Sequence, residues 1–328
     1  MTAGTAEQDV SDPLGTLEAL TSRRDADNAL LVDLLTTIGA RRRKGFQAQC
    51  LSGSFRAAAD LATAVGWHGG VILRDGKVLV ELDGVRFDAS TDLRFFRKNG
   101  APPGRKMLSV AKRFCGAVDT VFDLGANIGE IAIYCAFHLP QAQVFAFEPA
   151  PENLAALRTN LSLQTRALNN LTVVEEAVSG RSGSIAMTQG AGDLNTTVLT
   201  GNEDRLRGRG QISIVEVPAD TLAGFVGRLQ VDRIDFMKVD IEGGEPMLAE
   251  SIRELSGRLS VCMFEMSRYN TIDAYVDLDA SLRAAGMRAL SYDLKPLDDF
   301  RVELTARLEA GPAINVWYVR QDLLDRSS

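Results

Sequence analysis

Four residues in a short Gly-containing turn have the types and spacing to bind a small polar ligand. The apolar segment TVFDL at 120–124 contains Asp123, and Gly125, Asn127 and Gly129 follow it before a helical pattern begins. A strand, a tight turn and a helix in this order bring the free N–H groups of the helix N-terminus to a ligand. The spacing therefore predicts that these four residues contact that ligand.

A second acid ends the next predicted strand. QVFAFE at 143–148 places Glu148 where a carboxylate can accept hydrogen bonds from two ribose hydroxyls. A dinucleotide fingerprint has a glycine where the backbone approaches a pyrophosphate, and this chain has Asn127 there. A ligand without phosphates fits better, so the pattern predicts S-adenosyl-L-methionine. The alternative is that the glycines only allow the helix to pack closely on the strand.

Further carboxylates follow the ends of other predicted strands. The carboxyl ends of parallel strands meet at one edge of a sheet, where ligands bind. Besides Asp123 and Glu148, this edge is predicted to receive Glu176, Asp240, Glu242 and Glu265. Clustered acids destabilise a fold unless a cation or hydrogen-bond donors compensate, and a sulfonium with an amino group is such a cation. For Glu176, a solvated strand end is an equally good interpretation.

The most specific string is MKVDIEGGE, residues 237–245. Lys238 and Asp240 point to one side of a strand because side chains alternate with period two. Charged residues inside a buried parallel strand are uncommon, which favours a functional interpretation. Gly243 and Gly244 allow an unusual turn, and Glu245 either joins the site or only favours the start of the next helix.

The strings DLGANIG, FAFEP and MKVDIEGGE, in this order, resemble the FkbM family of S-adenosylmethionine-dependent methyltransferases. The resemblance covers about residues 105–328. It implies a class I methyltransferase fold, which is α/β and Rossmann-like with a mostly parallel seven-stranded sheet. It also implies O-methylation, commonly of a hydroxyl on a sugar or a glycosylated small molecule.

The resemblance also implies roles for individual residues. Asp123, Gly125, Asn127 and Gly129 would hold the methionine end of the cofactor, and Glu148 its ribose. Asp240 and Glu242 would face the zone of methyl transfer. Many relatives carry a His two residues after the acid of the fifth strand, Glu265 here, whereas this chain has Ser267. The chain must therefore use another base.

Our prediction for that base is Asp240, with Glu242 or Glu265 as alternatives, and Lys238 is predicted to orient a carboxylate or the acceptor. A base that removes the hydroxyl proton contributes about 10²–10⁴-fold to the rate. We predict no metal site. A Mg²⁺ ion on Asp240, Glu242 and Glu265 is the alternative, since oxygen ligands suit that ion.

The elements that must position these residues begin near residue 105. From there strands alternate with helices, and LTVVEEAV at 171–178 is predicted to be the third strand. This alternation predicts a doubly wound sheet in a domain at 105–328. Residues 1–104 are predicted to form helices at 13–43 and 54–66 and a small antiparallel meander, because Asp75-Gly76 and Asp83-Gly84 separate alternating apolar runs. This region is predicted to recognise the substrate or to form a homodimer contact. Polar residues 179–215 are predicted to form a loop or hairpin that covers the site.

Composition excludes several classes of protein. The net charge of −7 disfavours nucleic acid as a partner, because a phosphate backbone needs a basic surface. No apolar run approaches the roughly 20 residues of a membrane span. The N-terminus has no signal-peptide pattern and the four cysteines lie far apart, so we expect a reduced, cytoplasmic protein. Two alternatives to a small-molecule O-methyltransferase remain: a protein acceptor, or a cofactor-binding module without catalysis.

Overall fold

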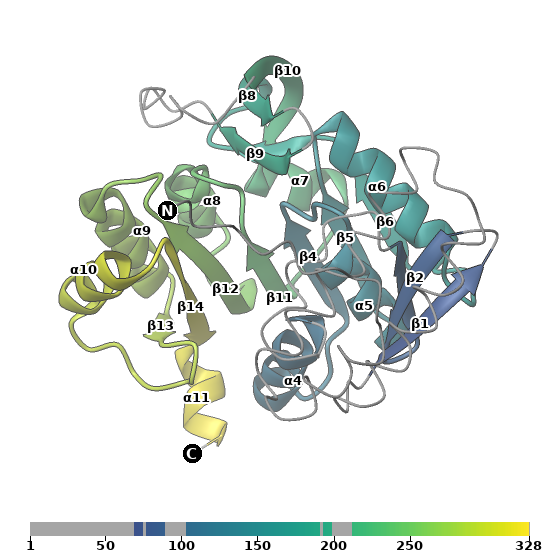
Figure 1. Cartoon of the computed structure of the whole chain (residues 1–328). Helices are drawn as coiled ribbons and strands as arrows, with labels where there is room; N and C mark the ends of the chain where they lie inside the picture. Colours follow the sequence, from purple (N-terminus) through teal and green to yellow (C-terminus); the bar gives the residue numbers. More distant parts are fainter. Residues whose placement is uncertain (1–68, 75–76, 89–102, 191–192, 199–211, 328) are drawn as a thin grey trace, which may run out of the picture. The chain divides into compact units, whose positions relative to one another are not determined.

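The computed structural model describes residues 69–74, 77–88, 103–190, 193–198 and 212–327 (Figure 1). The chain divides into two compact units. The first comprises Met1–Pro103 with Leu163–Thr165, and the second comprises Gly104–Ser162 with Arg166–Ser328. The helices predicted at 13–43 and 54–66 lie outside the described residues. The roles predicted for residues 1–104 stay predictions.

In the first unit, the described residues form a three-stranded antiparallel meander. Its strands are β1 (Gly69–Arg74), β2 (Lys77–Leu82) and β3 (Val85–Asp88), paired in that order. Asp83 and Gly84 between β2 and β3 both have positive φ, 52° and 82°, which a two-residue hairpin turn requires. The meander predicted from the two Asp-Gly pairs is therefore confirmed.

The second unit contains a seven-stranded sheet in the order β13-β14-β12-β11-β4-β5-β6. Its strands are β4 (Thr120–Leu124), β5 (Gln143–Phe147), β6 (Leu171–Val174), β11 (Ile234–Val239), β12 (Leu259–Ser267), β13 (Met287–Leu290) and β14 (Ala313–Arg320). Six strands run in one direction, and β14 is antiparallel to both of its neighbours. The predicted α/β fold with a mostly parallel seven-stranded sheet is confirmed.

The described helices of this unit connect or flank the strands. They are α4 (Pro103–Cys115), α5 (Glu130–His138), α6 (Pro151–Ser162), α7 (Leu222–Arg228), the 3₁₀ helix η3 (Glu245–Leu248), α8 (Ala249–Glu254), α9 (Ile272–Ala284), α10 (Phe300–Ala310) and α11 (Gln321–Ser327). Helices α7 to α10 share one apolar core with side chains of the sheet such as Phe122 and Leu124. Asp123 between them points to α5, because its carboxylate accepts a hydrogen bond from Ala132 N. Because side chains alternate along β4, Phe122 and Leu124 face the apolar core and Asp123 faces the opposite side, where the site lies.

The chain order creates a switch point between β4 and β11. From β4 the chain proceeds to β5 and β6 on one side, and it later returns to β11 and β12 on the other. In open α/β sheets, ligands bind at the carboxyl ends of the strands at such a point. The turns after β4 and β11 meet there, since Asp240 N donates to Leu124 O over 3.1 Å.

The described residues between 177 and 221 include a second sheet. It contains β7 (Ala177–Ser179), β8 (Gly183–Gly190), β9 (Asp193–Val198) and β10 (Ile212–Thr221) in the order β7-β10-β8-β9. Figure 1 shows β8, β9 and β10 together above the carboxyl end of β4. The predicted hairpin is thus present, but the single strand predicted at 171–178 is wrong. The chain leaves the main sheet at Val174, and Ala177 begins pairing with β10.

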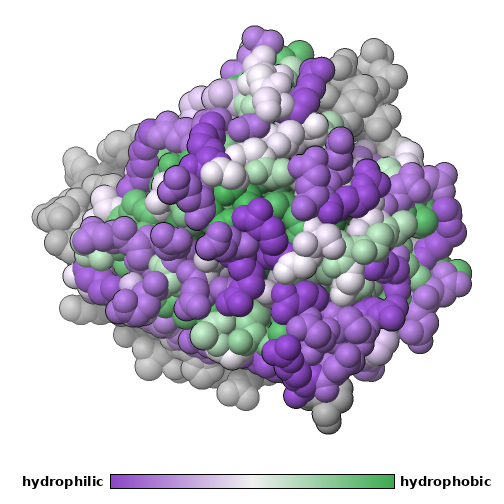
Figure 2. All heavy atoms as spheres, turned by 180° about the vertical axis from the view of Figure 1, so that it is seen from behind, coloured by the Kyte–Doolittle hydropathy of each residue, from purple (hydrophilic) through white to green (hydrophobic). Residues whose placement is uncertain are grey.

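Apolar side chains gather inside these units. On the face shown in Figure 2, hydrophilic residues predominate and hydrophobic ones appear in smaller patches between them. Among the described residues, the large apolar side chains left exposed are Ile214 and Val302, at 66% and 61%. Within the same residues, no helix has both the length and the apolar character to cross a membrane.

Candidate functional site

The turn after β4 needs glycine because another backbone segment passes directly against it. Gly125 has φ +77°, and a Cβ on it would lie 1.8 Å from the carbonyl oxygen of Asp240. Gly129 has φ +89°, and a Cβ there would press on Ile133 and Leu157. Asn127 also has a left-handed backbone, with φ 51°. The turn predicted from the sequence is therefore shaped by close packing against the end of β11.

Glu148 is held against this turn by backbone donors. Asn127 N donates to Glu148 Oε2 over 2.8 Å, and Ala150 N donates to Oε1 over 2.9 Å. The residue is 3% exposed, and burial raises its pKa to about 6 although the two N–H groups favour the charged form. Each carboxylate oxygen can accept a further hydrogen bond. The two features that the sequence assigned to one ligand are therefore in direct contact.

Lys238 lies among the acids of β4 and β11. Its Nζ donates to Gly125 O over 2.7 Å and lies 3.5 Å from Asp123 Oδ1 and 3.3 Å from Asp240 Oδ2. Burial by itself lowers the pKa of Lys238, but the carboxylates of Asp240, Asp123 and Glu130 raise it above its ordinary value. Lys238 therefore stays charged and ties the end of β11 to the Gly-containing turn.

Sequence reasoning missed Glu130, the first residue of α5. Its side chain is buried, and its Oε2 has no hydrogen-bond partner among the described residues. Burial raises the pKa of Glu130 to about 8, and Lys238 opposes this shift. The sequence does place an acid directly after Gly129. An acid at the start of a helix is also expected simply because it stabilises the helix dipole, so it did not indicate a site. Nearby Asp123 has its pKa raised to about 6 by the same cause.

The turn after β11 is organised by the carboxylate of Glu245. Glu242 has φ 49° and Gly243 has φ 103°, so two successive residues adopt left-handed conformations. Glu245 Oε1 accepts hydrogen bonds from Ile241 N at 3.1 Å and Gly243 N at 3.2 Å. Burial raises the pKa of Glu245 to about 7. Glu245 is thus a positioning residue that holds Glu242 at the rim.

Asn270 and Tyr275, which follow β12 in the chain, support this turn. The sequence analysis did not single out either residue. Asn270 Nδ2 donates to Gly243 O over 3.1 Å and to Glu245 Oε2 over 3.2 Å. The hydroxyl of Tyr275 donates to Glu245 Oε2 over 3.4 Å and accepts from Ser267 N over 2.9 Å. Both belong to the loop and helix after β12, where separation in sequence hides their contact with the turn.

Like charges at this rim oppose one another. Burial raises the pKa of Glu242 to about 8, and the carboxylates of Asp240, Glu265 and Glu245 add to the shift. Glu265 lies on β12 opposite Asn315. Its carboxylate lies near enough to Glu242 to raise the pKa of Glu242. The charged form of Glu242 is therefore disfavoured, and a cation bound beside it would favour that form.

The remaining predicted residues lie elsewhere or face inward. Glu176 lies between β6 and β7, and its carboxylate forms an ion pair with Arg228 of α7 at 2.7 Å. A binding role for Glu176 stays a prediction. Ser267, where relatives carry a His, is 8% exposed, and its Oγ accepts a hydrogen bond from Tyr269 N at 3.3 Å. Its side chain faces the interior of the unit.

Two further observations concern ligands. Within the described part of the chain, no group of three or more His, Cys, Asp and Glu side chains is arranged to hold a metal ion. Asn127 Oδ1 is buried and has no hydrogen-bond partner among the same residues. Together with the carboxylates, it makes this edge a surface of acceptors and negative charge. S-adenosylmethionine, with its hydroxyls, ammonium and sulfonium, fits that chemistry.

Comparison with known proteins shows the family. The model of the methyltransferase FkbM domain matches residues 123–287, just over half of the chain and less than the predicted 105–328. These residues contain the two turns, the last two residues of β4 and the strands β5, β11 and β12. The fold and site are those expected of a class I methyltransferase domain. The chain belongs to the FkbM methyltransferase domain family.

Curated relatives match over part of their length. Methyltransferase sdnD from Sordaria araneosa is 29% identical over 157 residues, which cover 41% of this chain and 60% of that protein. The 31-O-demethyl-FK506 methyltransferase FkbM from Streptomyces tacrolimicus is 39% identical, and the match covers 23% of this chain and 24% of that protein. Hexuronic acid methyltransferase AglP from Haloferax volcanii is 31% identical, and the match covers 39% of this chain and 47% of that protein.

A solved structure with partial likeness is the precorrin-6y C5,15-methyltransferase from Geobacter metallireducens. It is 15% identical, the match covers 71% of this chain and 93% of that chain, and the TM-score is 0.35. A score of this size carries no weight for the fold. The fold assignment rests instead on the strand order of this chain and on its family.

Proposed function

We propose that this protein transfers a methyl group from S-adenosylmethionine to a hydroxyl of a sugar or a glycosylated small molecule. The observation that carries the proposal is Glu148, buried and held by two backbone N–H groups, one from Asn127 in the turn after β4 and one from Ala150. A carboxylate held in this way is ready to accept the two ribose hydroxyls. Two relatives, named as a hexuronic acid methyltransferase and a 31-O-demethyl-FK506 methyltransferase, support an oxygen acceptor.

Different residues of the site would bind different parts of the cofactor. Asp123, Gly125, Asn127 and Gly129 would hold the methionine end of the cofactor, which supplies the electrophilic methyl group when bound. Glu242, whose pKa is raised by burial and by neighbouring carboxylates, would ionise more readily beside the positive charge of that end. Negative charge held in a partly buried site interacts more strongly than in water.

The acceptor hydroxyl needs a base and a fixed position. Asp240 is our candidate for the base, because it lies at the end of β11, its carboxylate is 3.3 Å from Lys238, and its side chain remains 20% exposed. Lys238 holds that carboxylate in place through this ion pair. Glu242 and Glu265 remain the alternatives for this role. Fixing the acceptor beside the methyl group contributes roughly 7–11 kcal/mol in the best intramolecular cases.

The first test is calorimetric titration of the full chain with S-adenosylmethionine. We expect binding by the wild type and an affinity at least about tenfold weaker for Glu148→Ala, since a charge-assisted hydrogen bond contributes about 1.5–3 kcal/mol. Glu175→Ala is the matched control, because Glu175 is half exposed and its carboxylate pairs with the exposed Arg158. Binding unchanged in Glu148→Ala would contradict the ribose assignment. No binding by folded wild-type protein would contradict the proposed function.

A further inference from the structure

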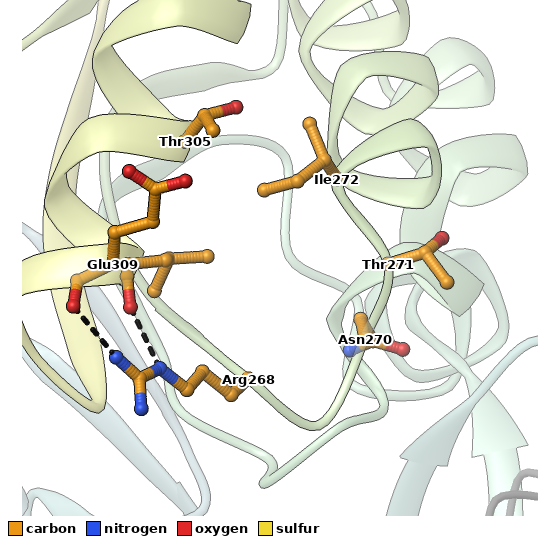
Figure 3. A pocket seen from close by; sticks show the side chains of 7 residues that line it. Arg268, Asn270, Thr271, Ile272, Thr305 and Glu309 are labelled. Atoms are coloured by element: carbon orange, nitrogen blue, oxygen red, sulfur yellow. Dashed lines mark hydrogen bonds between the residues drawn. The ribbon is translucent and has the colours of Figure 1, made fainter.

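A pocket of about 730 Å³ lies between the N-terminus of α9 and the C-terminal half of α10 (Figure 3). It begins at Arg268, directly after β12 ends. Figure 3 shows Thr305 and Glu309 on one side of the open space and Ile272 on the other, with Arg268 below. The pocket therefore opens at the same edge of the sheet as the acidic rim.

Asn270 joins the wall of this pocket to the site. It lines the pocket, and its Nδ2 donates to Gly243 O over 3.1 Å and to Glu245 Oε2 over 3.2 Å. Gly243 directly follows Glu242 in the chain. The pocket wall is thus bonded to the turn that carries a rim acid, which is where an acceptor must reach the methyl group.

The lining offers donors, acceptors and apolar surface to a hydroxylated molecule. Thr271 Oγ1 accepts from Ala274 N, so its own hydrogen can be donated to a ligand. Thr305 Oγ1 donates to Arg301 O, so its lone pairs can accept from a ligand. The side chain of Ile272 supplies an apolar wall for the less polar face of a ring.

The charges around the pocket disfavour an anion. Arg268 donates from Nε to Leu308 O at 2.6 Å and from Nη2 to Glu309 O at 3.0 Å. These carbonyls lie at the C-terminal end of α10, the negative end of the helix dipole, so they offset the guanidinium charge. Glu309 adds a carboxylate to the lining, and Glu245 lies behind Asn270. A carboxylate on the ligand would meet the carboxylate of Glu309, while the guanidinium of Arg268 is already bonded to two carbonyls of α10.

We propose that this pocket holds the methyl acceptor and that the acceptor is an uncharged, hydroxyl-rich molecule. The inference rests on the proposed function, because it assigns the acceptor of that reaction. Under this proposal the acceptor differs from that of a hexuronic acid methyltransferase, the kind of enzyme that one relative is named for. A hexuronate carries the negative charge that this lining excludes.

The test uses two probes that differ in one group, methyl β-D-glucopyranoside and methyl β-D-glucopyranosiduronate. Their dissociation constants are measured by NMR titration on the full chain with S-adenosylhomocysteine present. We expect the uncharged glycoside to bind about fivefold or more tightly, the effect of roughly one unfavourable charge contact near the surface. Glu309→Gln should reduce this preference, because it removes the nearest lining carboxylate.

Two variants on α10 locate the binding site. Thr305→Trp fills the pocket and should weaken binding of the uncharged glycoside by about tenfold or more. Val302→Trp makes the same substitution on an exposed residue outside the lining and should leave binding unchanged. Circular dichroism establishes that each variant is folded.

The proposal is overturned if the glucuronide binds more tightly, if neither glycoside binds, or if Thr305→Trp leaves binding of the uncharged glycoside unchanged. Failure of the proposed function has a different signature. In that case the wild-type chain does not bind S-adenosylmethionine in calorimetry, whatever the glycosides do.

Discussion

At the scale of single residues, the site is a set of acids around one buried cation. Lys238 contacts Gly125 O, Asp123 and Asp240 and therefore offsets charge at the ends of two strands. At Glu242 the effect of Lys238 is smaller than that of the surrounding carboxylates of Asp240, Glu265 and Glu245. The fold itself therefore stabilises the acids beside Lys238, whereas a positively charged ligand would stabilise Glu242.

The raised pKa of Glu242 makes stability depend on pH. Its pKa is about 8 in the folded chain against an ordinary value of 4.5, so the folded state holds the proton more tightly than the unfolded state. The resulting stabilisation is fully present below about pH 4.5 and is lost as pH rises through about 8. The wild type should therefore lose stability over this window as Glu242 ionises.

Glu242→Gln should remove that penalty. We expect it to stabilise the protein by roughly 1–2 kcal/mol more at about pH 8.5 than at about pH 6, measured by urea unfolding at each pH. Glu250→Gln, on the exposed surface of α8, is the control and should change the free energy of unfolding by less than about 0.5 kcal/mol at both. An equal effect of Glu242→Gln at the two pH values would contradict the repulsion inferred here.

At the scale of elements, the site depends on two turns that touch. The turn after β4 passes so close to the end of β11 that position 125 has no room for a side chain. The turn after β11 depends on Glu245, Asn270 and Tyr275, which come from three successive parts of the chain. Each turn is therefore a product of packing between elements as well as of its own sequence.

Gly125→Ala should be strongly destabilising. Its Cβ would lie 1.8 Å from Asp240 O, so the backbone of a turn must shift. We expect a loss of about 3 kcal/mol or more in urea unfolding, within the range of backbone strain and overpacking. Gly116→Ala is the matched control, since Gly116 also has positive φ, 73°, but has nothing within 4 Å of a Cβ. It should cost only about 1 kcal/mol. Similar losses in both variants would show that conformational strain alone explains position 125.

At the scale of the whole molecule, the candidate site lies in one of the two units. Asp123, Glu148, Lys238, Asp240 and Glu242 all belong to the unit made of Gly104–Ser162 and Arg166–Ser328. The pocket residues 268–272 and 305–309 belong to it as well. The cofactor and the acceptor pocket are thus assigned to the same unit, and the first unit is left with the predicted roles of recognition or dimerisation.

A shortened chain that begins at residue 103 should therefore bind S-adenosylmethionine with an affinity within about threefold of the full chain. The reason is that every predicted cofactor-binding residue remains. The measurement is calorimetry on both chains, with circular dichroism to show that the shorter one is folded. A folded short chain that has lost binding would show that residues before 103 take part in the cofactor site.

The sequence by itself determined the order of strands and helices in the second unit and the acids at their ends. Alternation along β4 and β11, the Gly-containing turns and the rhythm of strands and helices are local signals, because they depend on backbone geometry and side-chain direction within a few residues. The same signals predicted the meander. They misjudged residues 171–178, because the local pattern does not show that Leu171–Val174 and Ala177–Ser179 join different sheets.

Only the tertiary structure decided which of these groups act on one another. Glu130, Asn270 and Tyr275 carry no motif, and their importance appears when burial removes water and places them against Lys238 or Glu245. The ion pair of Glu176 with Arg228 and the pocket between α9 and α10 likewise join residues far apart in the chain. Charge interactions and cavities depend on distance and dielectric environment, which sequence spacing does not encode.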